Sequence, residues 1–98
     1  MRREKIGSAL AKYLPIIGQN VDRLRGKESA GDLAKRAGVS RSTVEAVIHG
    51  KAISLQNLCA IAEALGVTPA DLFITDLERG EISYKHKLLM ELLEIKKP

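Results

Sequence analysis

The chain has 98 residues with a formal net charge of +4, and hydrophobic residues fill 45% of its positions. This length suits one small domain with an appendage and excludes an enzyme that needs a large cleft. The single cysteine, Cys59, excludes an internal disulfide and fits a reduced, cytoplasmic setting, where we expect it to be a small buried residue. No apolar run reaches membrane-spanning length, and we do not expect the N-terminus to be a signal peptide.

Charge is unevenly distributed along the chain. Residues 1–51 carry 11 Lys and Arg against 5 Asp and Glu, whereas residues 52–98 carry 5 against 7. A basic first half is expected if that half faces nucleic-acid phosphates. A basic face that is merely solvated explains the same counts, so charge alone does not decide between the two.

The first 25 residues are predicted to be helical. Ile6, Leu10 and Tyr13 recur at helical spacing. Because Pro15 disfavours helix at the preceding residue and suits a first helical position, a second helix is predicted from Pro15 to about Arg25. Residues 1–14 are then a helical arm that either precedes this helix or extends it.

Residues 29–51 are predicted to form two short helices joined by a tight turn. Ser29 and Ser40 are suitable N-caps, and Gly38 can take the positive φ that ends the first helix. Val44 and Val47 give the second helix an apolar stripe. Helices this short need a third surface to pack on, because helix nucleation is costly. This arrangement is typical of a helix-turn-helix.

Further helices are predicted in the second half of the chain. Ser54 caps a helix over residues 55–65, whose expected core face comprises Leu55, Leu58, Ile61, Ala62 and Leu65. Thr68 and Pro69 begin another short helix. Residues 76–81 are polar and contain a glycine, so they are predicted to be a linker or turn. A last helix is expected from about residue 83 to 96, with a short strand at residues 82–85 as the alternative.

The last helix carries more apolar surface than one short helix needs to lie on a finished domain. The residues concerned are Leu88, Leu89, Leu92, Leu93 and Ile95. This helix either folds back to complete the core or packs against a second copy or another protein. We favour a homodimer.

Residues 20–74 resemble the lambda-repressor/Cro type of helix-turn-helix, the Xre family. The matching positions include Leu33-Ala34, Ala37-Gly38-Val39-Ser40, Arg41-Ser42-Thr43-Val44, Val47, Gly50-Lys51, Ala64-Leu65-Gly66-Val67 and Asp71-Leu72-Phe73. The resemblance implies an all-α fold: a compact bundle of about five short helices with an N-terminal helical arm and a C-terminal helix. The expected divisions are an arm at residues 1–14, the DNA-binding domain at 15–75 and a dimerisation or partner-binding segment at 76–98.

The resemblance also implies where DNA would be contacted. In this family the second helix of the motif, here about Ser40–His49, enters the major groove of double-stranded DNA. Carried over by position, the base-reading candidates are Arg41, Ser42, Glu45 and Ala46. The phosphate candidates are Ser40, Thr43, His49, Lys51, Lys35 and Arg36. The family commonly has a glutamine near Ala30, and this chain lacks that phosphate contact.

We therefore expect a cytoplasmic transcriptional regulator of prokaryotic or phage type, most simply a repressor that binds an operator as a dimer. One alternative is an antitoxin-like or adaptor protein whose last helix binds another protein, and another is a nucleic-acid binder without sequence preference. His49 and His86 lack metal-ligand spacing to Cys, Asp or Glu, and no glycine-rich phosphate loop is present. We expect no enzymatic activity, no metal, no cofactor and no membrane partner.

Overall fold

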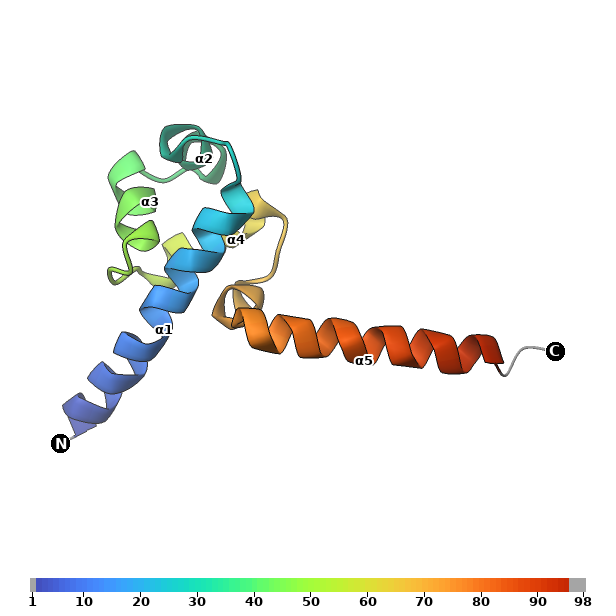
Figure 1. Ribbon diagram of the computed structural model, residues 1–98. Helices are drawn as coiled ribbons and strands as arrows, with labels where there is room; N and C mark the ends of the chain where they lie inside the picture. The colour runs from blue at the N-terminus through green and yellow to red at the C-terminus, as the bar shows by residue number, and fades with distance from the viewer. Residues whose placement is uncertain (1, 96–98) are drawn as a thin grey trace.

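The computed structural model describes the backbone of residues 2–95 and the side chains of residues 10–93. Helices α1 (Arg2–Arg25), α2 (Ala30–Ala37), α3 (Arg41–Ile48) and α4 (Leu55–Leu65) are followed by a short 3-10 helix, η1 (Pro69–Phe73), and by α5 (Asp76–Ile95). Within residues 2–95 there is no strand. The prediction of an all-α bundle is confirmed. We call α1 to η1 the head, from which α5 projects (Figure 1).

The core of the head draws on every one of its helices. Fully buried side chains come from α1 (Val21), α2 (Leu33), α3 (Val44), α4 (Ile61) and η1 (Leu72). Burying one such side chain contributes about 1.5–3 kcal/mol, so no single helix of eight residues has to be stable alone. Aliphatic side chains dominate this core, as the shortage of aromatic residues required.

Local capping signals set the ends of α2 and α3. The Ser29 hydroxyl accepts from the Asp32 amide at 3.1 Å, and the Ser40 hydroxyl accepts from the Thr43 amide at 3.1 Å. Gly38 ends α2 with φ 73°, in the left-handed region that favours glycine. The predicted helix-turn-helix is therefore present, and these caps fix the angle at which α3 leaves α2.

The predicted helix break at Pro15 is wrong, because α1 runs through it as one helix. A proline inside a helix removes one hydrogen bond and crowds the preceding turn. Packing against α3 offsets this cost. A Cβ on Gly18 would lie 2.5 Å from the Val47 carbonyl oxygen, and a Cβ on Gly50 would lie 3.7 Å from Pro15 Cα. Backbone of α1 thus rests directly on the end of α3, and the arm extends the first helix of the head.

The predicted linker at residues 76–81 is also wrong, because these residues form the first turns of α5. The cause is a capping box before them. The Thr75 hydroxyl accepts from the Glu78 amide at 3.2 Å, and the Glu78 carboxylate accepts from the Thr75 amide at 3.2 Å. Residues 82–85 are helical, so the alternative of a strand is excluded.

Two further side chains lie elsewhere than expected. Leu55 was placed on the core face of its helix, but it is the first residue of α4 and is 74% exposed. Cys59, expected to be buried, is exposed. The core face of α4 is instead formed by Leu58, Ile61 and Ala62.

A buried asparagine anchors α5 to the head. Asn20 on α1 is 3% exposed, and its amide nitrogen donates to the carbonyls of Leu72 at 2.8 Å and Ile74 at 2.9 Å. Its amide oxygen accepts from Arg79 of α5 at 3.2 Å, and Arg79 also pairs with Asp76. The direction in which α5 leaves the head is therefore set by contacts at its first turn.

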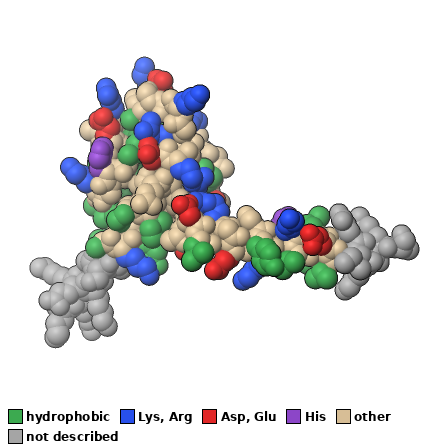
Figure 2. All heavy atoms as spheres, viewed as in Figure 1, with side chains coloured by type: hydrophobic (Ala, Val, Ile, Leu, Met, Phe, Trp, Pro, Cys, Tyr) green, Lys and Arg blue, Asp and Glu red, His purple; other side chains and the backbone are tan. Residues whose placement is uncertain are grey.

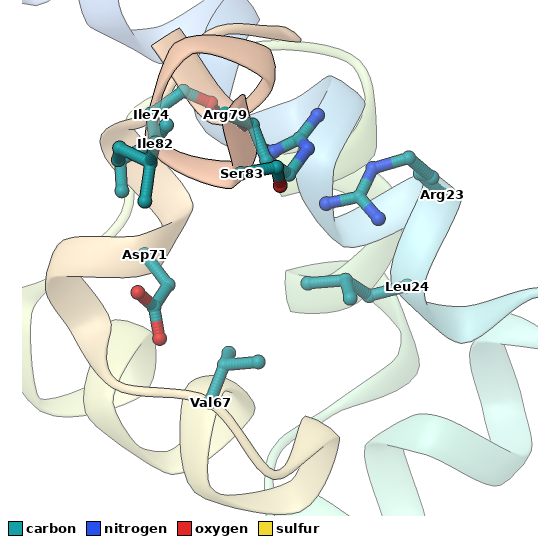
Figure 3. A pocket seen from close by; sticks show the side chains of 8 residues that line it. All are labelled: Arg23, Leu24, Val67, Asp71, Ile74, Arg79, Ile82 and Ser83. Carbon is teal, nitrogen blue, oxygen red and sulfur yellow. Dashed lines mark hydrogen bonds between the residues drawn. The ribbon is translucent and has the colours of Figure 1, made fainter. Parts of the chain in front are cut away.

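A pocket of about 290 Å³ opens beside this anchor. Figure 3 shows Arg23 and Leu24 of α1 facing Ile82 of α5 across it, with Val67 and Asp71 at its far end. The pKa of Asp71 lies below its ordinary value because the Thr68 amide and hydroxyl hydrogen-bond to the carboxylate. This carboxylate is thus part of the N-cap of η1.

Beyond its first turns, α5 projects away from the head (Figure 1). From Gly80 to Leu93 every residue is exposed. The residues predicted to form a dimer or partner interface include Leu88, Leu89, Leu92 and Leu93, which are 40%, 54%, 55% and 49% exposed. The side chain of Ile95, the fifth of them, lies outside the described residues. In the single chain α5 does not fold back to complete the core.

Candidate nucleic-acid interface

Helix α3 presents two different faces because of its residue spacing. Val44 and Val47 are buried against the head. At 3.6 residues per turn, Arg41, Glu45 and His49 fall on the opposite side, and all three are exposed. Ser42 lies near the middle of the same face and is exposed, and Ala46 lies beside it and is half-buried. The structure therefore brings all four predicted base-reading positions together on one outward face.

Arg41 is the longest polar side chain on this face. Its side chain is 73% exposed, and its Nε lies 3.6 Å from a carboxylate oxygen of Glu45, one helical turn later. An exposed pair of this kind contributes about 0–1 kcal/mol, so the guanidinium can exchange Glu45 for another partner at small cost.

The start of α2 makes room for Arg41. A Cβ on Gly31 would lie 3.8 Å from the Cδ of Arg41 and 3.9 Å from the Ser29 hydroxyl. The aliphatic part of Arg41 therefore passes over the first turn of α2, next to the residue where the resembled family commonly has glutamine. Sequence reasoning missed Gly31, because nothing local links it to a residue ten positions later.

Three hydroxyls gather at the start of α3. The Ser40 hydroxyl lies 2.8 Å from that of Thr43 and 3.1 Å from that of Ser42. Ser40 also accepts from the Thr43 amide, so its cap is part of the same cluster. Hydroxyls can donate to phosphate oxygens as readily as to each other, and this cluster lies at the positive end of the helix dipole.

The end of α3 presents His49 and Lys51. The Nδ1 of His49 lies 2.7 Å from the Glu45 carbonyl oxygen. A carbonyl only accepts, so Nδ1 carries the proton in this contact. The remaining Nε2 of a neutral ring is then an acceptor, which makes neutral His49 a poor phosphate ligand. Lys51 is exposed in the loop beyond and carries a full charge.

Arg36 does not join this face, although its sequence position suggested a phosphate contact. Its guanidinium donates to both carboxylate oxygens of Glu28, at 2.7 and 2.8 Å, and to the Ala64 carbonyl at 2.5 Å. The hydrogen bonds from Arg36 hold the pKa of Glu28 below its ordinary value, and the Glu28 carboxylate raises the pKa of Arg36. We assign Arg36 a structural role, joining α2 to the end of α4. Lys35 on α2 is exposed.

Lys and Arg side chains stand out from the upper and left-hand parts of the head in Figure 2, where α2 and α3 lie in Figure 1. This is the basic half of the chain. Among the described residues, no helix is long and apolar enough to cross a membrane, and no group of three His, Cys, Asp or Glu side chains could hold a metal ion.

A comparison with protein families identifies the domain. Residues 19–78, more than half of the chain, match the model of the Cro/C1-type helix-turn-helix DNA-binding domain. The match begins within α1, just before Asn20, and ends in the first turn of α5, so it spans the core except for Ile17, the outward face of α3 and the anchor of α5. Comparison with curated proteins and with solved structures found no match.

Proposed function

The chain belongs to the Cro/C1-type helix-turn-helix DNA-binding family, and on this premise we propose that it is a sequence-specific transcriptional repressor of bacterial or phage type. The observation that carries the proposal is the outward face of α3. It holds Arg41, Ser42 and Glu45 away from the buried Val44 and Val47. A helix in the major groove needs such a face, polar outside and anchored to the domain from behind.

Base reading is assigned first to Arg41. A guanidinium can donate to guanine O6 and N7 together, which is worth about 1–3 kcal/mol of discrimination. Glu45 can accept from cytosine N4, Ser42 can serve either partner, and Ala46 offers only apolar contact to a thymine methyl. The weak Arg41–Glu45 pair supports this assignment, because it positions both side chains without binding either tightly.

Phosphate contacts are assigned to the two ends of α3 and to α2. Ser40 and Thr43 supply hydroxyls at the start of α3, and Lys51 and Lys35 supply charge. His49 ranks below Lys51 as a phosphate contact, because its Nδ1 is already engaged by the Glu45 carbonyl. These contacts position the protein without reading sequence, so affinity should fall steeply as salt rises.

Repression follows most simply if the protein acts as a dimer on an operator in bacterial or phage-infected cells. Two half-sites would then lie about 34–36 Å apart, one turn of the DNA helix. The exposed leucines of α5 support a dimer, with residues 15–75 as the DNA-binding unit and residues 76–98 as the association segment. Residues 2–14 are the first part of α1.

The same leucines favour a second candidate function, that of an antitoxin-like adaptor. In this reading the exposed stripe Leu88–Leu93 grips a different protein, and DNA binding serves to place that partner on an operator. The solution mass of the full chain separates the two, because an adaptor without its partner would be a monomer.

Substitution of Arg41 by alanine tests the base-reading proposal. The preferred operator would be selected from random duplexes with the full chain, and binding would then be measured on that operator and on an unrelated duplex. The preference for the operator should fall by roughly 5- to 150-fold, while binding to the unrelated duplex changes little.

Lys51→Ala is the matched control, since it removes a phosphate contact. It should weaken binding to both duplexes by the same factor and reduce the slope of log affinity against log salt concentration by about 1. If Arg41→Ala also weakens both duplexes equally, Arg41 contacts only phosphate. Binding without sequence preference would then be the better description.

A further inference from the structure

The pocket of about 290 Å³ beside the anchor of α5 combines apolar walls with one charged end. The apolar side chains that line it are Leu24, Val67, Ile74 and Ile82. In Figure 3 the guanidinium groups of Arg23 and Arg79 extend toward the same end of the pocket, next to the Ser83 hydroxyl. Sites for small molecules commonly have this composition, a mostly apolar lining with a few polar groups placed together.

Arg23 supplies a charge that no ion pair of the fold uses. It is exposed on α1 and has no ion-pair partner among the described side chains. The adjacent Asp22 pairs instead with Arg25, with 2.7 Å between nitrogen and oxygen. The Arg23 guanidinium therefore keeps its charge and its N–H donors for a ligand in the pocket.

Arg79 is held in place by the fold but also keeps a donor for a ligand. One of its terminal nitrogens donates to the Asn20 amide oxygen at 3.2 Å, and the other pairs with Asp76. The Asp76 side chain is 88% exposed, so solvent screens this pair and leaves much of the positive charge of Arg79 in effect. The Nε–H of Arg79 takes no part in these contacts. Arg79 thus offers a guanidinium whose position is set by the contact between α1 and α5.

We propose that this pocket binds a small organic acid, with its carboxylate at Arg23 and Arg79 and its apolar body against Leu24 and Ile82. A carboxylate accepts N–H bonds from a guanidinium in pairs, and an anion between two guanidinium groups removes their mutual repulsion. The volume is close to the lower limit for small-molecule sites, about 300 Å³, so the ligand has to be small. This binding site goes beyond the proposed repression and does not depend on it.

Asp71, at the far end of the pocket, restricts the ligand to a single negative charge. Its carboxylate accepts from the Thr68 amide at 2.9 Å, and the hydrogen bonds with Thr68 hold the pKa of Asp71 below its ordinary value. The carboxylate is therefore ionised at neutral pH, and it would repel a second carboxylate on the ligand. An acid with one carboxylate and an apolar chain fits the pocket better than a diacid of the same length.

A bound acid would bridge α1 and α5. Arg23 belongs to α1, whereas Arg79 and Ser83 belong to α5. A ligand that contacts both helices adds a second tie beside the one between Asn20 and Arg79, and it binds only when the two helices are in place. Binding therefore stabilises the arrangement in which the first turns of α5 rest on the head.

Sodium hexanoate is a suitable probe, because it joins one carboxylate to a short alkyl chain. Its binding to the full chain would be followed by nuclear magnetic resonance of the backbone amides at constant ionic strength. The comparison compounds are hexanol without the charge, acetate without the chain, and adipate with a second carboxylate. For hexanoate we expect saturable shifts at Arg23, Ile82 and Ser83 with a dissociation constant on the order of 1 mM, and binding at least about 10-fold weaker for the other three compounds.

Arg23→Gln and Lys27→Gln separate binding in the pocket from general attraction to a basic protein. Both side chains are exposed, so both variants should keep the fold, and circular dichroism would confirm equal helix content. Arg23→Gln should raise the dissociation constant of hexanoate by roughly 10-fold, because it removes one of the two guanidinium groups. Lys27→Gln removes the same charge outside the pocket and should leave the constant unchanged.

Three results would overturn the proposal: equal weakening by the two variants, shifts confined to the exposed leucines of α5, and no saturable shift at the pocket. Hydrogen exchange tests the bridge, since hexanoate should slow exchange of residues 76–83 in the unsubstituted chain and have less effect in Arg23→Gln. Unchanged exchange at saturating hexanoate would refute the bridge. These measurements use no DNA, so their failure leaves the proposed repression untouched.

Discussion

The head and α5 are both helical and leucine-containing, yet they use apolar side chains in opposite ways. In the head, Leu33, Ile61 and Leu72 are fully buried, because four helices and η1 share one small core. In α5, Leu89 and Leu92 are more than half exposed although the helix is well capped. Local signals are therefore enough to begin a helix, but only its neighbours in space decide whether its apolar face is buried or exposed. The head has found those neighbours within one chain, whereas residues 80–93 of α5 are exposed in the single chain.

Substitution of one glycine in the head and one in α5 tests this difference directly. The largest effect on stability is expected at Gly18 in the head. The Cβ added by Gly18→Ala would lie 2.5 Å from the Val47 carbonyl and 2.9 Å from the Ile48 carbonyl. Both contacts are with backbone, which cannot rotate aside. We expect the free energy of unfolding to fall by at least about 2 kcal/mol, as measured by urea denaturation. An unchanged midpoint would show that α1 does not rest on α3 at this point.

The next largest loss of stability is expected where α5 joins the head. Asn20→Ala leaves the Leu72 and Ile74 carbonyls and Arg79 without their buried partner. Unfolding free energy should fall by about 1–3 kcal/mol, the usual cost of such groups left unsatisfied. Hydrogen exchange should show faster exchange in the first turn of α5 as well. The neighbouring Gln19→Ala is the control, since Gln19 is exposed and should change neither quantity.

A stabilising effect is expected for substitution of the second glycine, Gly80, which lies within α5. A Cβ on Gly80 meets nothing within 4 Å. Alanine is about 0.5–1 kcal/mol better than glycine inside a helix, so Gly80→Ala should slow hydrogen exchange along α5. The urea midpoint of the head should stay where it is. A shift of the head midpoint equal to the gain in α5 would mean that the two regions unfold as one unit.

These contrasts explain how much could be predicted from sequence. The ends of α2, α3 and α4 were predictable because a cap concerns residues three positions apart, as with Ser29 and Asp32. The candidate face of α3 was predictable for the same reason, since its spacing follows the buried Val44 and Val47. The capping box at Thr75 and Glu78 is equally local but was missed, because the polar stretch with a glycine that follows suggested a linker.

What local sequence reasoning could not supply depends on contacts between residues distant in sequence. Continuity of α1 through Pro15 depends on packing against α3, where Gly18 meets the carbonyls of Val47 and Ile48. The role of Arg36 depends on Glu28 and on the Ala64 carbonyl, 28 residues away. Neither partner is marked by a motif, and a lone arginine on a basic helix is equally compatible with DNA phosphate. Periodicity cannot distinguish such cases, because it reports which face a residue is on and not what lies against that face.

The smallest predicted effect, also within the head, tests the structural role of Arg36 through pH. Because Arg36 lowers the pKa of Glu28 in the folded chain, the unfolded chain binds more protons in the acid range. This contribution to stability is complete above about pH 5 and is lost as pH falls through about 4 and below. Asp71, whose pKa is lowered by Thr68, acts in the same direction.

Thermal unfolding of Glu28→Gln and Asp71→Asn between about pH 6 and 3 separates the two contributions. Each variant should start less stable than the unsubstituted chain and lose less stability on acidification. Glu28→Gln should also leave operator binding at neutral pH unchanged, because its partner Arg36 is directed toward α4 and away from the outward face of α3. If Glu28→Gln instead tightens DNA binding, the freed guanidinium reaches phosphate, and Arg36 belongs to the interface after all.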